Sequence, residues 1–158
     1  MALNAYLNLV GQKQGQIKSS VIQKGREGAI MVIAFNHEVT CPLDPMGRVT
    51  GKRQHSPLTI LKEIDAASPA LMRMLITGER TKLCELRFWQ PSATGAEIQH
   101  FTIALKNASI MAIRQEMLNN KYPENSLHKE REFVTFAYEG IRWTHEVGQQ
   151  TCEDTWTV

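Results

Sequence analysis

The segment from Ala29 to Phe35 constrains the fold more than any other part of the chain. Successive side chains of a strand point to opposite faces, which places Ile30 and Val32 together on one face. A helix is disfavoured because the run is short and rich in β-branched and aromatic residues. We predict a central strand whose second face is covered within the chain or by a neighbouring subunit. That second face carries Met31, Ile33 and Phe35.

Length and composition indicate one domain spanning residues 1–158. We expect no further domain at the C-terminus. A chain of 158 residues, with 42% hydrophobic and 22% charged residues, can bury a core without metals or disulfides. The net charge of +2 is too small to indicate a general nucleic-acid or membrane surface. We therefore expect neither nucleic-acid binding nor membrane insertion.

The sequence favours a chain that folds in the cytoplasm. It has no apolar run near the roughly 18 residues that a membrane span needs, and the N-terminus lacks the basic and apolar regions of a secretory signal. The three cysteines, Cys41, Cys84 and Cys152, are far apart and odd in number, which argues against a disulfide framework. If the protein is exported, it must leave without a cleavable signal peptide.

Two Ser-Pro pairs, Ser56-Pro57 and Ser68-Pro69, are typical of helix starts. We expect one helix up to Ala67, with Lys62 and Glu63 facing solvent, and a second helix ending at Thr77-Gly78.

Alternation with a period of two predicts strands through much of the remaining sequence. Residues 36–55 and 119–128 lack this alternation and are predicted loops, the first long enough to indicate a function. These patterns predict a mainly β fold: a small β-barrel of antiparallel strands with a flanking α-helix and a long extended loop. The strands are expected at residues 2–10, 16–23, 29–35, 82–90, 97–105, 108–117 and 132–145.

The sequence contains no motif for catalysis, for a metal or for a cofactor. His37 and Cys41 have a spacing that could begin a zinc site, but no second pair of ligands accompanies them. Cys84 falls on an apolar strand face, which favours a small buried side chain over a nucleophile. The cluster Lys52-Arg53-x-His55 could contact nucleic acid, but it lacks interleaved aromatic residues. We predict that the protein is not an enzyme.

Short motifs along nearly the whole chain resemble the haemolysin-coregulated protein family, the inner-tube proteins of the bacterial type VI secretion system. Their order and spacing make the resemblance specific. One position departs from it: Ser19 stands where the family often has glycine. Serine would perturb a local turn if that position needs a positive φ, or an interface if it needs close approach of a subunit. The motifs are Tyr6-Leu-Asn-Leu, Gly15-Gln-Ile-Lys18, Gly25-Arg-Glu-Gly28, Pro57-Leu-Thr, Lys62-Glu-Ile-Asp65, Ser68-Pro-Ala-Leu71, Tyr122-Pro-Glu-Asn125, Glu130-Arg-Glu-Phe-Val-Thr-Phe136 and Glu153-Asp-x-Trp156.

The resemblance implies a hexameric ring with a wide channel, and rings that stack into a tube. It also implies the partners: other copies of the chain, a contractile sheath, a spike protein and small effector proteins carried in the lumen. The protein would be made in the cytoplasm and then secreted when the sheath contracts. An alternative is a ring-shaped effector-binding chaperone or export receptor without a long-tube role. A β-barrel enzyme and a nucleic-acid-binding barrel remain competing classes.

Charge suggests how rings would stack. The loop at residues 39–54 has a net charge of +2, and residues 144–158 carry three acidic and no basic side chains. Opposite charges at opposite ends favour head-to-tail contacts, which salt would weaken. We predict a stacking interface formed by Thr40, Asp44, Arg48, Lys52, Arg53, Glu146, Glu153 and Asp154.

Overall fold

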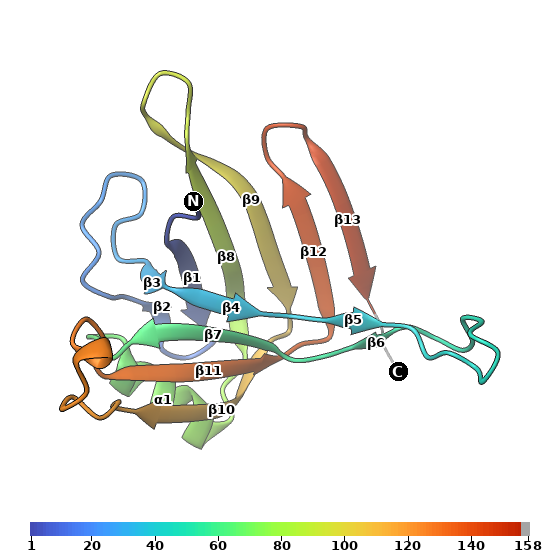
Figure 1. Ribbon diagram of the computed structural model, residues 1–158, viewed down its shortest axis with the longest axis horizontal. Helices are drawn as coiled ribbons and strands as arrows, with labels where there is room; N and C mark the ends of the chain where they lie inside the picture. The colour runs from blue at the N-terminus through green and yellow to red at the C-terminus, as the bar shows by residue number, and fades with distance from the viewer. Residues whose placement is uncertain (156–158) are drawn as a thin grey trace.

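The computed structural model describes residues 1–155 and consists of antiparallel β-sheets with one α-helix (Figure 1). The larger sheet has the order β13-β12-β9-β8-β1-β2, and β3 also pairs with β1. Its strands are β1 (Ala5–Gly11), β2 (Gly15–Ile17), β3 (Ile30–Val32), β8 (Thr81–Pro91), β9 (Glu97–Lys106), β12 (Gly140–His145) and β13 (Gln150–Thr155).

The smaller sheet has the order β10-β11-β7-β4, and a separate two-stranded ladder joins β5 to β6. Helix α1 packs against β10 (Figure 1). The remaining bounds are β4 (Ala34–Asn36), β5 (Val39–Thr40), β6 (Gln54–His55), β7 (Leu58–Glu63), α1 (Ser68–Thr77), β10 (Ser109–Glu116), the 3₁₀ turn η1 (Pro123–Asn125) and β11 (Arg131–Ala137).

The predicted central strand is two short strands, because the chain changes sheet at Ile33. β3 pairs with β1 in the larger sheet, and β4 pairs with β7 in the smaller one. At the crossing, the backbone N–H of Ile33 donates to the carbonyl of Leu61 at 2.9 Å. Ile30 and Val32 are buried, whereas Ile33 is 42% and Phe35 44% exposed. One face of the segment is therefore covered by the chain, and the other is largely open.

The predicted long strand at residues 132–145 is also divided between the sheets. β11 pairs with β10 and β7, and after a break at Tyr138-Glu139 the chain continues as β12, which pairs with β9 and β13. The mainly β, antiparallel fold is confirmed, with its flanking helix and long extended loop. Within residues 1–155, the chain passes between the larger and the smaller sheet at these crossings, and the strands do not form one continuous hydrogen-bonded cylinder.

Both sheets contribute to a single apolar core. The inner faces of β8 and β9 carry Cys84, Leu86, Ile103 and Leu105, which are all buried. Other core side chains come from β1, β3, β7, β11 and α1: Leu7, Leu9, Ile30, Val32, Leu58, Ile60, Leu71, Met74, Val134 and Phe136.

The helix predicted at residues 56–67 is wrong, because residues 58–63 form β7. Leu58, Ile60 and Lys62 alternate on the buried face, so Lys62 does not face solvent as predicted. The β-branched side chains of Thr59 and Ile60 fit a strand better than a helix. Lys62 is tolerated in the interior because its register partner on β11 is Glu132.

The helix predicted at residues 68–77 is confirmed as α1. It ends at Gly78, whose φ of 66° is left-handed, as expected for a glycine that terminates a helix. No helix within residues 1–155 is long and apolar enough to cross a membrane.

Smaller details of the sequence prediction differ from the structure. The second predicted strand extends only over Gly15–Ile17, and β13 was not predicted. Ser19 is accommodated without strain, because its φ is not positive and its hydroxyl donates to Asp65 Oδ2 at 2.7 Å. The serine therefore does not perturb the turn. Trp156, which closes the last sequence motif, lies outside the described residues together with 157–158.

Candidate assembly surfaces

The segment between β4 and β7 forms a hairpin that projects from one side of the molecule (Figure 1). We call residues 39–55 the arm. β5 and β6 pair at its base, and Leu43 pairs with Val49 further out. Near its tip, Asp44 Oδ1 accepts hydrogen bonds from the backbone N–H groups of Met46 at 2.9 Å and Arg48 at 2.8 Å. The predicted long loop is thus a hairpin with its own pairing.

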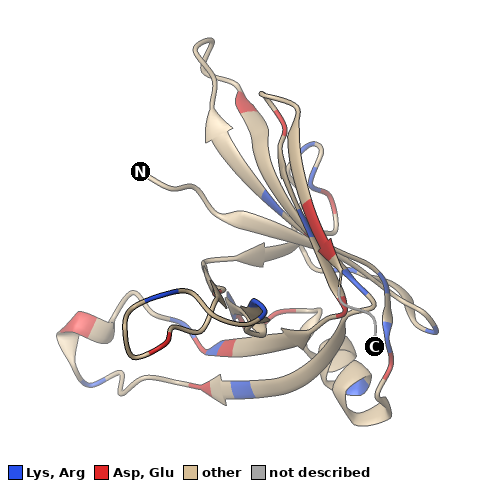
Figure 2. Cartoon of the chain, turned by 90° about the vertical axis from the view of Figure 1, so that its right-hand side faces the viewer, with Lys and Arg blue, Asp and Glu red and all other residues tan. Residues whose placement is uncertain are grey.

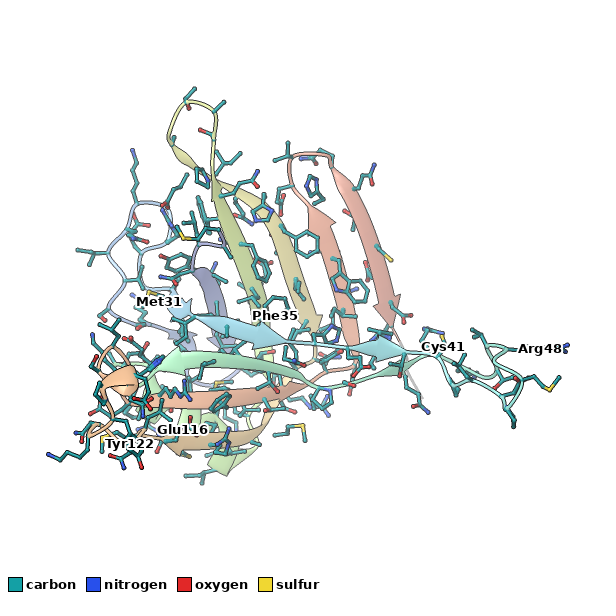
Figure 3. The ribbon with its side chains drawn as sticks, viewed as in Figure 1. Met31, Phe35, Cys41, Arg48, Glu116 and Tyr122 are labelled. Carbon is teal, nitrogen blue, oxygen red and sulfur yellow. The ribbon has the colours of Figure 1, made fainter. Side chains whose placement is uncertain are left out.

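The outer arm presents apolar and basic side chains that its own chain does not cover. Leu43 is 64%, Val49 68% and Met46 78% exposed. Leu43 and Val49 are cross-strand partners, and such partners project from the same face of a ladder. Arg48 lies at the far end of the arm (Figure 3), and Lys52 is also exposed. The arm can therefore offer a partner both apolar contacts and positive charge.

At its base the arm is tied to β13 by Asp154. Arg53 donates to both oxygens of the Asp154 carboxylate through Nε and a terminal nitrogen, and His55 Nε2 lies 2.7 Å from Asp154 Oδ2. Hydrogen bonds from Arg53 and then from His55 hold the pKa of Asp154 well below its usual range. Asp154 is thus a carboxylate anchor for the two residues at which the arm returns to the sheets.

Aromatic rings complete this anchor. Tyr138, in the break between β11 and β12, donates its hydroxyl proton to the carbonyl of Ser56 at 2.9 Å and also contacts His37 Nε2. The His55 ring stacks on Trp143 with centroids 6.4 Å apart and meets Tyr138 edge-on at 6.1 Å. Burial raises the pKa of Tyr138 to about 12. We call His37, His55, Tyr138, Trp143 and Asp154 the base cluster.

A second uncovered surface lies beside β4. A groove of about 370 Å³ opens between the N-terminal residues and strands β3, β4 and β8. The ring centroids of Phe35 and Phe88 are 5.0 Å apart, and Phe35 lies along β4 where it borders this groove (Figure 3). We call this surface the side groove. Its large apolar lining residues are Leu3, Val32, Ile33, Phe35, Phe88 and Trp89.

The structure divides the predicted stacking residues into separate groups. Thr40, Asp44, Arg48 and Lys52 lie on the arm, whereas Arg53 and Asp154 pair with each other within the protomer. Glu153 pairs with Lys106, and Glu146 Oε1 accepts a hydrogen bond from the hydroxyl of Thr102 at 2.7 Å. Acidic and basic segments are interspersed over both sheets (Figure 2). The acidic residues therefore do not form one continuous patch.

The side chains considered above for chemistry are buried or contact other residues of the protomer. Cys84 is buried, as predicted, and burial raises the pKa of its thiol to about 12, so it is not a nucleophile at neutral pH. His37 contacts Tyr138, and within residues 1–155 no three metal-ligating side chains gather into a group. Arg53 and His55, once candidates for phosphate contact, both face Asp154. These groups therefore make contacts within the protomer.

Sequence analysis missed the base cluster and the buried Lys62–Glu132 pair. His37 and Tyr138 are 101 residues apart, as are Arg53 and Asp154, so no local pattern reports either contact. The pair of Lys62 and Glu132 had a detectable signal. Lys62 and Glu132 each share the buried face of a strand with apolar residues at alternate positions. Two strands that bury side chains of opposite charge in this way are candidates for pairing.

An antiparallel β fold with an extended arm and an open apolar groove defines a protomer with two uncovered surfaces. Comparison with known proteins identifies its kind. The family model described as "Type VI secretion system effector, Hcp" matches residues 6–145, and the chain belongs to this family of haemolysin-coregulated proteins. The resemblance seen in the sequence motifs is confirmed, and the protein is a secreted tube or effector protein of the type VI secretion system.

Individual relatives agree with this assignment. A Pseudomonas aeruginosa protein named "Major exported protein" is 39% identical over 166 residues, which cover 99% of this chain and 96% of that protein. A crystal structure of an Hcp protein has a TM-score of 0.90 at 27% identity, covering 98% of each chain. The Hcp1 protein from the E. coli EAEC 042 pathovar has a TM-score of 0.88 at 32% identity, covering 99% of this chain and 100% of that one.

Proposed function

We propose that protomers of this chain, each a single tube-protein domain, close into six-membered rings, and that the rings stack head-to-tail into the tube that the secretion system expels. The observation that carries the proposal is a protomer with two separate uncovered surfaces, the arm and the side groove. Contacts between unlike surfaces are heterologous. They close into rings when the rotation permits and extend into filaments when it does not.

The side groove is assigned to the contact between neighbours in one ring. Ile33 and Phe35 continue a buried segment, yet they stay open on their second face. A neighbour packed there would remove apolar surface from water, at about 25 cal/mol for each Å² buried. The groove is bordered by β4, a short strand at the edge of its sheet, so a neighbour would also cover an exposed edge.

The arm is assigned to the contact between stacked rings. Its outer part combines the exposed Leu43, Met46 and Val49 with the cations Arg48 and Lys52. In this proposal Arg53 and Asp154 hold the base of the arm, because they already pair with each other within the protomer. The other predicted stacking residues, Thr40, Asp44, Glu146 and Glu153, remain part of the proposed interface. Exposed charges are screened by salt, so stacking should weaken as ionic strength rises.

The proposal extends to export and partners. The Pseudomonas aeruginosa relative is named an exported protein, and we infer that this chain is likewise made in the cytoplasm and exported without cleavage of a signal peptide. Its partners would be further copies of itself, a spike protein, a contractile sheath and small effectors in the lumen. Its role would be structural, without catalysis.

Charge reversal on the outer arm tests the stacking contact. The double variant Arg48→Glu with Lys52→Glu should form rings but no tubes in electron micrographs, because the arm loses both cations and gains two anions. The matched control is Arg73→Glu with Lys82→Glu, an equal change at two exposed positions on α1 and β8. Tubes of unchanged length in the arm variant would refute the assignment. Wild-type rings that never form tubes would favour the ring-shaped chaperone or export receptor.

A further inference from the structure

The arm enters and leaves the two sheets through a pair of histidines. His37 lies two residues before the first residue of the arm, and His55 is its last residue. Both imidazoles pack on the same two rings: the His37 centroid lies 5.8 Å from that of Tyr138 and 6.2 Å from that of Trp143, and the corresponding distances for His55 are 6.1 and 6.4 Å. Both ends of the arm therefore depend on one small cluster of side chains.

The hydrogen bonds fix where the proton of His37 lies. A tyrosine hydroxyl carries one proton, and Tyr138 donates its proton to the carbonyl of Ser56 at 2.9 Å. His37 Nε2 must then be the donor in its contact with the Tyr138 oxygen. A neutral His37 satisfies this requirement with its single N–H on Nε2. The base cluster is thus complete without a charge on His37.

The carboxylate of the base cluster is already engaged, so it offers no free counter-ion to a second proton on His37. His55 of β6 and Arg53, just before β6, both bind the carboxylate of Asp154 in β13. Cys41 of the arm is close enough to Arg53 to interact with its charge. The titratable group from the β11–β12 break is Tyr138, which stays protonated at neutral pH because burial raises its pKa to about 12. Burial, and then the positive charge that His55 carries when protonated, lower the pKa of His37.

We propose that His37 is an acid-responsive latch of the arm: protonation adds a positive charge to a cluster whose one carboxylate already binds Arg53 and His55, and the base of the arm opens. The sign follows from linkage. A histidine with a lowered pKa in the closed state binds its proton more readily in the open state, so closure is favoured above the ordinary histidine value of about 6.5 and is lost as the pH falls below it. One proton changes the opening equilibrium by at most about tenfold per pH unit.

The latch has a consequence for assembly. An arm with an open base cannot hold its apolar and basic side chains in a fixed position, so tubes should shorten between about pH 6.5 and pH 5.5. This consequence rests on the proposed stacking role of the arm. The latch itself does not, because it concerns contacts within one protomer.

Hydrogen–deuterium exchange of the arm base tests the latch directly. The backbone N–H of Ser56 donates to the carbonyl of Glu38 at 3.0 Å, and its protection reports whether the base is closed. In the wild-type protein, exchange of this region, corrected for the intrinsic pH dependence of exchange, should rise at least threefold from pH 7.5 to pH 5.5. The His37→Gln variant retains an N–H donor for Tyr138 but does not titrate, so its corrected exchange should stay constant.

His128→Gln is the matched control, because His128 is exposed on the loop after β10 and should leave the wild-type slope unchanged. A flat wild-type profile, or a slope that survives in His37→Gln, would overturn the latch. If His37→Gln does not fold, an NMR titration of the His37 ring in the wild-type protein replaces it, and a pKa at or above 6.5 would overturn the proposal. Exchange that rises while tubes persist at pH 5.5 would support the latch and refute the stacking role of the arm.

Discussion

The buried ion pair between Lys62 and Glu132 makes a sharp prediction about stability. Lys62 Nζ lies 2.6 Å from Glu132 Oε1, 3.0 Å from Asp65 Oδ1 and 3.2 Å from Ser68 Oγ, and both members of the pair are fully buried. Gln115 Nε2 donates to the other oxygen of Glu132 at 2.9 Å. Because these partners come from β7, β10, β11 and α1, the pair joins the small sheet to its helix.

The two single variants should differ in their cost. Removing one member of a buried pair costs about 3 to 5 kcal/mol, because the other charge is left in the interior. Lys62→Met leaves Glu132 without a cation, so we expect the upper end of that range at pH 8. Glu132→Gln leaves Lys62 beside Asp65, so we expect about 3 kcal/mol. The double variant Lys62→Met with Glu132→Leu buries no charge and should be less destabilised than Lys62→Met alone.

Urea unfolding at a fixed protomer concentration measures these differences, with Lys106→Met as the matched control. Lys106 pairs with Glu153 at the surface, where an ion pair contributes less than about 1 kcal/mol. The loss in Lys62→Met should shrink at pH 5, because a buried carboxylate without a cation takes up a proton. If Lys62→Met lowers the free energy of unfolding no more than Lys106→Met does, the buried pair does not join the helix to the sheet.

Three further predictions follow from local structure. Gly78 has a left-handed backbone and open space around its Cβ position, so Gly78→Ala should cost about 1 to 2 kcal/mol of unfolding free energy, with a smaller loss for Gly78→Asn, in urea titrations. Stability should fall as the pH drops below about 4.5, the ordinary value for glutamate. Burial alone would raise the pKa of Glu132, but hydrogen bonds from Lys62, Gln115 and Ser68 lower it. The unfolded state therefore binds the proton more readily than the folded state. Unfolding curves that do not change between pH 6 and pH 3.5 would contradict this prediction. Iodoacetamide at pH 8 should leave Cys84 unmodified in the folded protein and label it in urea, because burial raises the pKa of this thiol to about 12. Mass spectrometry that finds Cys84 labelled in the folded protein would refute its burial.

Local sequence patterns predicted the elements whose polar and apolar residues are cleanly separated. β1, β8 and β9 alternate, and α1 begins with a Ser-Pro pair and ends at Gly78, so their positions followed from periodicity and from the glycine at the helix end. Ser68 was expected to cap the helix start, but the N-cap residue is Ala67. The Ser-Pro pair before β7 predicted a helix, and the burial of Lys62, which marks a strand, depends on Glu132, 70 residues away. β13 was missed because its exposed residues show no apolar alternation.

Crossings between sheets could not be predicted from alternation. The runs at 29–35 and 132–145 keep their apolar character through Ile33 and Tyr138, and only the pairing partners show that each run changes sheet there. The arm was predicted from its length and basic charge. Its anchor at Asp154 was not, because the contact requires the three-dimensional arrangement of β6 and β13.

The central claim is that copies of the protomer cover the apolar face that Phe35 leaves open. Light scattering coupled to size-exclusion chromatography tests it most directly. The wild-type protein should have about six times the protomer mass of 17.9 kDa, and Phe35→Asp should shift it toward the protomer. A wild-type protein that stays at 17.9 kDa at high concentration would contradict the account.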